Sequence, residues 1–174
     1  MKISQILLAT YKTTIYIPPT TNWARDINGG TATASSNPGG AGFAPSTAIN
    51  GVRDAQQWGN GGGWYSSSAL PQWLQVSLVS PKAITTIILY GVRDGTTTPG
   101  EPNINETTST YSNLDFLVQA YVAGAWTTLA TYTSNNKLMV VTTVSLTAQD
   151  FRVYFTRCGD NSAHVIELEI IGPT

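Results

Sequence analysis

The chain has 174 residues, which is enough for one well-cored domain and too few for two ordinary ones. Only 11% of the residues are charged, against about 25% in an ordinary soluble domain, and Thr, Ser, Asn and Gly take their place. The net charge is −1, from nine Lys and Arg against ten Asp and Glu, so no basic field exists to attract nucleic acid or an anionic membrane surface. We therefore expect a single domain that has no nucleic-acid partner.

Residues 1–21 are expected to form an N-terminal arm or linker, separate from a domain at residues 22–174, because Pro18-Pro19 interrupts any strand or helix. The apolar stretch at residues 6–9 is shorter than the ~7–15 residues of a secretory signal, and nothing later approaches the ~18 of a membrane span. We therefore expect no cleaved signal peptide and no membrane insertion. So apolar an arm is expected to be covered by its own domain, by a protein partner that contacts residues 1–20, or by a second copy in a homo-oligomer.

Beyond the arm, short segments with apolar residues at every second position alternate with clusters of Gly, Asn, Pro and Ser. Leu74, Val76 and Leu78 share one face of such a segment, and in another segment Val118 and Val122 share a face. No amphipathic helix of useful length lies between the segments, so the sequence predicts two antiparallel sheets packed face to face. About eight strands are expected, at residues 31–35, 72–79, 83–90, 115–122, 125–132, 138–146, 151–156 and 164–171.

The stretch WGNGGGWYSS at residues 58–67 places glycines between two tryptophans. A dinucleotide-binding fingerprint fails here because Trp64 stands where the third glycine is required, and a phosphate loop fails because the stretch has no lysine. Glycines beside aromatic residues more often take positive φ or let the chain pass close to a bulky ring. Trp64 is therefore expected in the core or at its rim.

No motif in the sequence predicts catalysis. The single histidine, His164, lies in an apolar C-terminal segment where a structural role is expected, and no nucleophile-elbow motif accompanies it. A pair of carboxylates for glycoside hydrolysis stays open, because separations in space do not follow from the sequence. We expect that the protein is not an enzyme.

Several motifs follow one another in a fixed order over residues 22–172. They are STAING at 46–51, WGNGGGWYSS at 58–67, LPQWLQVSL at 70–78, AITTIILYGVRD at 83–94, TTSTY at 107–111, FLVQAYVAGAWTTL at 116–129, FRVYFT at 151–156 and IELEIIG at 166–172. Together they resemble the discoidin domain, also called the coagulation factor V/VIII type C domain, which overlaps the carbohydrate-binding modules of family 32. The resemblance implies an all-β fold, an eight-stranded antiparallel jelly-roll β-sandwich of the galactose-binding-like type, which is usually non-catalytic and presents ligands to loops at one end.

The resemblance also implies a structural calcium ion, which the family often holds beside a loop at residues 50–58 and the final strand. The family's usual Asp-Gly-Asp is Asn50-Gly51-Val52 here, so one carboxylate becomes a neutral amide and another is lost. Asn50, Asp54 and Glu167 are the candidate metal-ligating side chains, and backbone carbonyls would supply more of the roughly six to eight oxygens that calcium takes. The alternative is that Asn50-Gly51 is a turn that Glu167 caps with hydrogen bonds.

For sugars, the resemblance implies an exposed aromatic ring that stacks on the apolar face of the ligand and a few polar side chains that hold its hydroxyls. Arg93 stands at the approximate place of a ligand-holding arginine, although Arg93 and Asp94 could instead form a surface ion pair without a function. The absence of a histidine from the loops argues against galactose specifically. The candidate ligand-binding residues are Tyr65, Trp58, Asn60, Arg93, Asp94, Glu101, Asn103 and Asn161.

Two hypotheses of function are open. In the first, the chain is a non-catalytic glycan-binding or adhesion module, displayed on a virion or another large extracellular particle by its arm, with a cell-surface polysaccharide or glycoprotein as its partner. In the second, it is a purely structural component, such as a phage tail, fibre or capsid decoration protein, that binds no sugar. The apolar arm, the low charge and the single cysteine, Cys158, motivate the second. Both place the protein outside the cell or on a virion surface.

Overall fold

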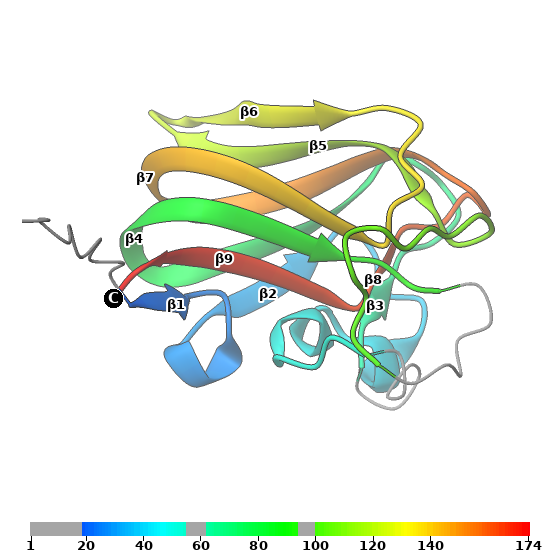
Figure 1. Cartoon of the computed structure of the whole chain (residues 1–174), viewed down its shortest axis with the longest axis horizontal. Coiled ribbons are helices and arrows are strands. Elements are labelled where there is room, and N and C mark those ends of the chain that lie inside the picture. Colours follow the sequence, from blue (N-terminus) through cyan, green and yellow to red (C-terminus); the bar gives the residue numbers. More distant parts are fainter. Residues whose placement is uncertain (1–18, 55–61, 94–99) are drawn as a thin grey trace, which may run out of the picture.

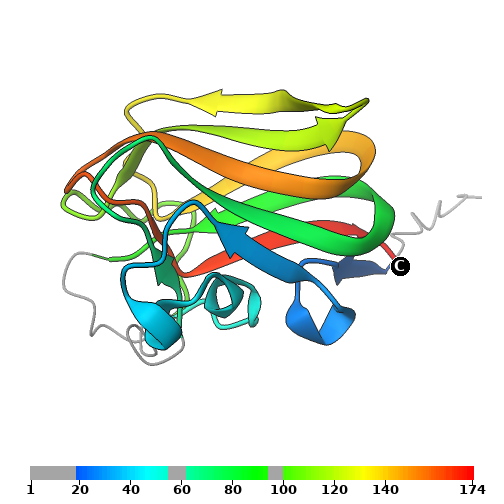
Figure 2. The same cartoon turned by 180° about the vertical axis from the view of Figure 1, so that it is seen from behind.

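The computed structural model describes residues 19–54, 62–93 and 100–174. Within these ranges the secondary structure is almost entirely β-strand, as the composition predicts, with short 3-10 helices on one side of the strands (Figures 1 and 2). No helix in these ranges is long and apolar enough to cross a membrane. The elements are β1 Thr20–Asn22, η1 Asp26–Asn28, β2 Thr31–Ala34, η2 Gly40–Phe43, η3 Pro45–Ile49, β3 Trp64–Tyr65, β4 Gln72–Tyr90, β5 Asn113–Val122, β6 Ala125–Tyr132, β7 Met139–Cys158, β8 His164–Val165 and β9 Glu167–Pro173.

Two long strands bend and so contribute to both layers of the sandwich. β4 and β7 pair antiparallel along their length, with a register shift between Ser77 and Lys82 where they pass from one layer to the other. On one side of this bend β2 pairs with β4, β5 pairs with β7, and β6 pairs with β5. On the other side β9 pairs with β4, and β1 pairs with β9. The result is the antiparallel jelly-roll sandwich that the sequence predicts (Figure 1).

The strand boundaries differ from the predicted ones where a strand bends or changes partner. The segments predicted at 72–79 and 83–90 form one strand, β4, because pairing with β7 continues around the bend. The strand predicted at 164–171 is divided in two, because His164 pairs with β3 whereas Glu167 begins the pairing with β4. The strand predicted at 125–132 has the bounds of β6.

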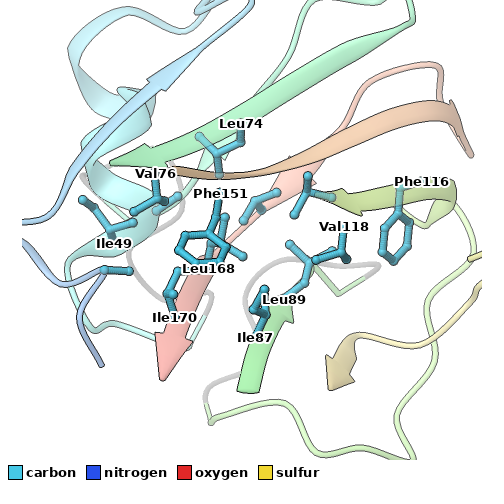
Figure 3. Close-up of a cluster of buried hydrophobic side chains, with 14 of the residues drawn as sticks. Ile49, Leu74, Val76, Ile87, Leu89, Phe116, Val118, Phe151, Leu168 and Ile170 are labelled. Atoms are coloured by element: carbon cyan, nitrogen blue, oxygen red, sulfur yellow. The ribbon is translucent and has the colours of Figure 1, made fainter. Parts of the chain in front are cut away.

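The core lies between the two layers. Leu74, Val76 and Leu78 are buried, as their alternation predicts, and so is Val118. Figure 3 shows Leu74 and Val76 of β4 in one cluster with side chains of β5, β7 and β9. Val122, which the alternation places on the same face as Val118, is 38% exposed, because it pairs with Ala125 at the hairpin end of β5.

The two ends of the described chain lie side by side. Thr20 of β1 pairs with Pro173 of β9, and the N–H of Thr174 donates to the carbonyl of Pro19 at 3.1 Å. Thr20 and Thr21, which the sequence assigned to the arm, are therefore part of the sheet. Residues 1–18 lie outside the described residues. β3 and β8 lie at the other end of the sandwich, away from the C-terminus (Figures 1 and 2).

Candidate functional site

A pocket of about 260 Å³ lies beside the short pairing of β3 with β8. Phe43, Tyr65, Val92, Tyr111 and His164 line it. These residues come from η2, from β3, from the segments that follow β4 and precede β5, and from β8, so the pocket exists only once distant parts of the chain have met. Four of the five side chains are rings, which gives the pocket flat, largely apolar walls.

The rings of the pocket contact one another in a continuous set. Tyr65 meets Phe43 edge to face, with ring centroids 4.8 Å apart, and lies nearly parallel to His164 at 6.1 Å. Tyr111 lies on His164 with centroids 4.9 Å apart. Separations of roughly 4.5–7 Å are those of stabilising aromatic pairs, so the walls of the pocket support each other.

Gly39 allows Phe43 and Tyr65 to approach this closely. A Cβ atom at residue 39 would lie 2.5 Å from Cδ2 of Phe43 and 2.7 Å from Cε1 of Tyr65, well inside van der Waals contact. The absence of a side chain is therefore required by the two rings. Gly39 therefore serves the packing of the pocket wall.

The pairing of β3 with β8 fixes Tyr65 and His164 relative to each other. The two residues are direct partners in the register, and the N–H of Ser66 continues the ladder by donating to the carbonyl of Ala163 at 2.9 Å. The buried side chain of Asn113 holds the backbone of His164 from both sides: its Nδ2 donates to the carbonyl at 2.7 Å, and its Oδ1 accepts from the N–H at 3.1 Å. The backbone beneath the imidazole is thus tightly fixed.

Trp64, the neighbour of Tyr65, points the other way, as alternation along a strand requires. Its side chain is fully buried, its Nε1–H donates to the carbonyl of Ser36 at 2.9 Å, and its ring lies 6.3 Å from that of Phe155. The prediction that Trp64 belongs to the core is confirmed. The glycine-rich stretch therefore contributes one ring to folding and the next to the pocket.

The imidazole of His164 is buried and has a defined tautomer. Its Nδ1 lies 3.0 Å from the carbonyl oxygen of Ser162, and because a carbonyl only accepts, the neutral ring carries its proton on Nδ1. Nε2, 3.6 Å from Oδ2 of Asp160, is then a hydrogen-bond acceptor. Burial lowers the pKa of His164, against the opposing effects of Asp160 and the Ser162 carbonyl, so the ring is neutral at pH 7. The sequence predicts a structural role for His164 and no histidine near the ligand candidates, whereas in the structure its ring lines the pocket beside Tyr65.

Arg93, the predicted ligand-holding arginine, binds the loop at residues 100–106. Its Nη2 donates to Oε1 and Oε2 of Glu106 at 3.0 and 2.8 Å, and its Nε donates to Oε1 at 3.3 Å. Its Nη1 donates to the carbonyl of Gly100 at 2.6 Å, and Nη2 to that of Glu101 at 3.2 Å. The side chain is 13% exposed. The guanidinium thus holds the loop that follows the pocket residue Val92.

The other predicted ligand-binding residues are dispersed. The side chain of Glu101 is 65% exposed and lies 3.5 Å from Nη1 of Arg53. Oδ1 of Asn103 accepts from the N–H of Asn105 at 2.9 Å, and Asn161 lies in the turn before β8 with φ 66°. Of the predicted residues that the structure describes, Tyr65 alone is among the five that line the pocket. Trp58, Asn60 and Asp94 lie outside the described residues.

The sequence-based prediction missed Phe43, Val92, Tyr111 and His164. Tyr111 ends the motif TTSTY, and Phe43 follows a cluster of glycines, so both carried a local signal for an aromatic residue in a loop. His164 had only its uniqueness in the chain. None of these signals shows that the three residues meet, because that depends on the pairing of β3 with β8.

The candidate calcium residues lie where the loop after η3 meets β9. Oδ1 of Asn50 accepts from the N–H of Val52 at 2.9 Å, and Oε1 of Glu167 accepts from the N–H of Gly51 at 3.0 Å. This is the capped turn that the sequence left open as the alternative. Burial, opposed by the Gly51 N–H and reinforced by Glu169, raises the pKa of Glu167 to about 8. The described residues contain no group of three or more His, Cys, Asp or Glu side chains suited to a metal ion.

The fold is that of solved carbohydrate-binding modules. The chain is similar to chitosan-binding module 1 of a chitosanase/glucanase from Paenibacillus sp. IK-5, with 26% identity over 87% of this chain and 99% of that chain and a TM-score of 0.64. It is also similar to the family 32 module of C. perfringens NanJ in complex with galactose (21% identity, 82% and 93% coverage, TM-score 0.58) and to the lectin domain of lectinolysin complexed with Lewis B antigen (19%, 86% and 95%, TM-score 0.60).

The family itself is shown by sequence. Residues 31–169 match the model of the F5/8 type C domain, and the chain therefore belongs to this family. The resemblance to the discoidin domain that the motifs indicate is confirmed. A search of curated proteins finds no match.

Proposed function

We propose that this domain is a non-catalytic glycan-binding module that takes one sugar ring into the aromatic pocket. The observation that carries the proposal is the set of three aromatic rings around a neutral imidazole. The axial C–H face of a hexose is apolar and slightly positive, and it complements the negative face of an aromatic ring. The volume of about 260 Å³ falls just below the roughly 300–1,000 Å³ of sites for drug-sized ligands, which suits a single ring.

The polar atoms at the pocket favour a ligand that donates hydrogen bonds. In its neutral form His164 presents Nε2 as an acceptor, and the carboxylate of Asp160 lies 3.6 Å from that atom. A sugar hydroxyl or amine can donate to either. No Lys or Arg is among the five lining residues in the described part of the chain. The pocket therefore suits neutral or amino sugars better than sugars that carry a carboxylate.

The relatives support a glycan as the ligand. Three similar structures are complexes with galactose, Lewis B antigen and chitotriose, and the chitosan-binding module 1 is 26% identical to this chain. Hydrolysis of a glycoside would need two carboxyl groups placed on either side of the scissile bond. None of the residues that line the described pocket is a carboxylate, so a binding role is favoured over a catalytic one.

A glycan array followed by calorimetry tests the proposal. We expect binding to glycans that end in galactose, N-acetylhexosamine or glucosamine, and weaker binding to uronates. Tyr111→Ala should weaken binding by roughly tenfold, because one stacking face is lost. The matched control is Tyr121→Ala, which removes an exposed tyrosine of β5 that packs on Trp126 and does not line the pocket. Absence of binding at millimolar glycan, or equal affinity in Tyr111→Ala and wild type, contradicts the proposal.

We also propose that the domain acts outside the cell, on a virion or another large particle, with residues 1–18 as its attachment. The apolar composition of the segment before Pro18-Pro19 supports this. Deletion of residues 1–18 should release the domain from that particle while glycan binding persists. If the deleted protein stays incorporated, attachment lies elsewhere. If no glycan binds but incorporation depends on residues 1–18, the purely structural role is the better description.

A further inference from the structure

Three of the oxygen atoms that would be expected to hold calcium already accept hydrogen bonds from the protein, whereas the buried Oε2 of Glu167 has no such donor among the described residues. The backbone carbonyl of Asn50 accepts from Nη2 of Arg25 at 3.2 Å, and its side-chain Oδ1 accepts from the N–H of Val52. Oε1 of Glu167 accepts from the N–H of Gly51. Calcium takes roughly six to eight oxygen ligands, and here two oxygens of the loop and one of β9 already accept from N–H groups. The residues present do not fit a calcium ion.

The guanidinium of Arg25 also fills the space beside the loop. A Cβ atom on Gly51 would lie 2.6 Å from Cζ and 2.7 Å from Nε of Arg25, so the guanidinium lies directly against this residue. Gly51 has φ +84°, which favours glycine for a second reason. A metal ion bound to the Asn50 carbonyl would face the positive charge of Arg25 at close range. The loop is therefore built around a guanidinium.

A second arginine neutralises the neighbouring carboxylate on β9. Nε and Nη2 of Arg53 lie 2.7 and 2.6 Å from Oε1 of Glu169, whose side chain is 2% exposed. The guanidinium also lies 5.5 Å from the ring of Tyr90, within cation–π range. A carboxylate this deeply buried is stable only when it is paired, and Arg53 provides the pair.

The two carboxyl groups of β9 and the two guanidinium groups lie in one cluster. Glu167 and Glu169 are two residues apart on β9 and so project from the same face of the strand. Arg25 lies against Gly51, whose N–H donates to Glu167, and Arg53 pairs directly with Glu169. We propose that Arg25 and Arg53 take the place of a structural cation in this domain, so that its stability is independent of calcium.

Thermal unfolding of the full chain tests this proposal. The midpoint should be the same in millimolar calcium and in excess EDTA, and calorimetry should detect no calcium binding. Arg25→Met should lower the midpoint by roughly 5–10 °C, because it removes a positive charge beside the buried carboxyl groups and leaves the part-buried carbonyl of Asn50 without its donor, whereas Arg25→Lys should restore part of the loss by keeping the charge. The matched control is Arg157→Met, which removes a 49% exposed guanidinium paired with Asp115 and should change the midpoint little.

Two results would overturn the proposal. One is a higher midpoint, or stoichiometric binding, when calcium is added to the wild-type chain. The other is an Arg25→Met variant as stable as Arg157→Met. If Arg25→Met does not fold, the calcium titration of the wild type decides the question alone. Glycan binding plays no part in any of these readouts, so failure of the proposed function would leave this test unaffected.

Discussion

His164 makes the stability of the domain depend on pH in a direction that burial dictates. Its pKa in the folded state lies below the ordinary value of 6.5, chiefly because the buried ring resists a charge. As the pH falls below about 6.5, the unfolded chain binds a proton that the folded chain does not, and the free energy of unfolding decreases. The stabilising effect of the neutral ring is complete above the pKa that His164 has in the unfolded chain. It is lost as the pH falls toward the lower pKa of the folded chain.

Glutamine cannot titrate in this pH range. We therefore expect that the stability lost in His164→Gln relative to wild type becomes smaller in acid. The free energy of unfolding of this variant relative to wild type, measured by urea denaturation, should move in the variant's favour between about pH 7.5 and about pH 5.5. Both proteins contain Glu167, whose raised pKa makes the free energy of unfolding increase as the pH falls. This contribution cancels when the variant is compared with wild type. A difference that does not change with pH would mean that His164 titrates alike in both states.

At the scale of the elements, the short helix η2 and the two-residue strand β3 form the pocket by direct contact of their rings. Phe43 closes η2 and Tyr65 closes β3, and the edge-to-face contact between them depends on the missing side chain of Gly39. The pocket is thus more sensitive to small changes in η2 than to changes in the long strands.

Gly39→Ala should reduce glycan affinity by tenfold or more, because the added methyl group forces Phe43 and Tyr65 apart. The measurement is calorimetry with the glycan found on the array. Gly91→Ala is the matched control: it lies one residue from the pocket residue Val92, and its Cβ would meet the nearest atom at 3.5 Å, an ordinary contact. Equal losses in both variants would show that any alanine near the pocket is disruptive and would contradict the role given to Gly39.

The elements were predictable to different degrees. β6 follows from its sequence alone, because its residues continue without a break between two turns. His164 and Val165 form β8 only because they face β3, and in the sequence they are continuous with the buried residues of β9. An apolar run of this kind predicts burial well and cannot show where one strand changes partner. The sequence indicates Tyr65 as a ligand candidate, but for His164, its partner across the sheet, it predicts only a structural role.

Arg93 shows a similar limit for polar residues. The resemblance to the family predicts that Arg93 holds a ligand. Its partner in the structure is Glu106, thirteen positions further on, and no local sequence pattern predicts this ion pair. Ion pairs across a loop depend on how the loop folds back. For this reason the sequence predicted which polar side chains are candidates for binding and missed the ion pairs that they form with one another.

At the scale of the whole molecule, the core between the layers carries the stability. Val76 and Val79 lie three positions apart on β4, and Val76 is fully buried whereas Val79 is 69% exposed. Val76→Ala should lower the free energy of unfolding by about 2–3 kcal/mol, because it removes two buried methyl groups and leaves a cavity. Val79→Ala, the same chemical change in water, should cost less than about 0.5 kcal/mol. Denaturant titration measures both, and similar values for the two variants would contradict the assigned layer geometry.

The pairing of β1 with β9 has a mechanical meaning for anything joined to this domain. Both ends of the described chain leave the sandwich together, held by the contact of Thr174 with Pro19, and β3 and β8 lie at the far end (Figure 1). A carrier fused before Thr20 or after Thr174 would thus be attached at one end of the sandwich, and the aromatic pocket at the opposite end would face away from it. A pull between a carrier and a glycan in the pocket would run along the length of the strands, from one tip of the sandwich to the other.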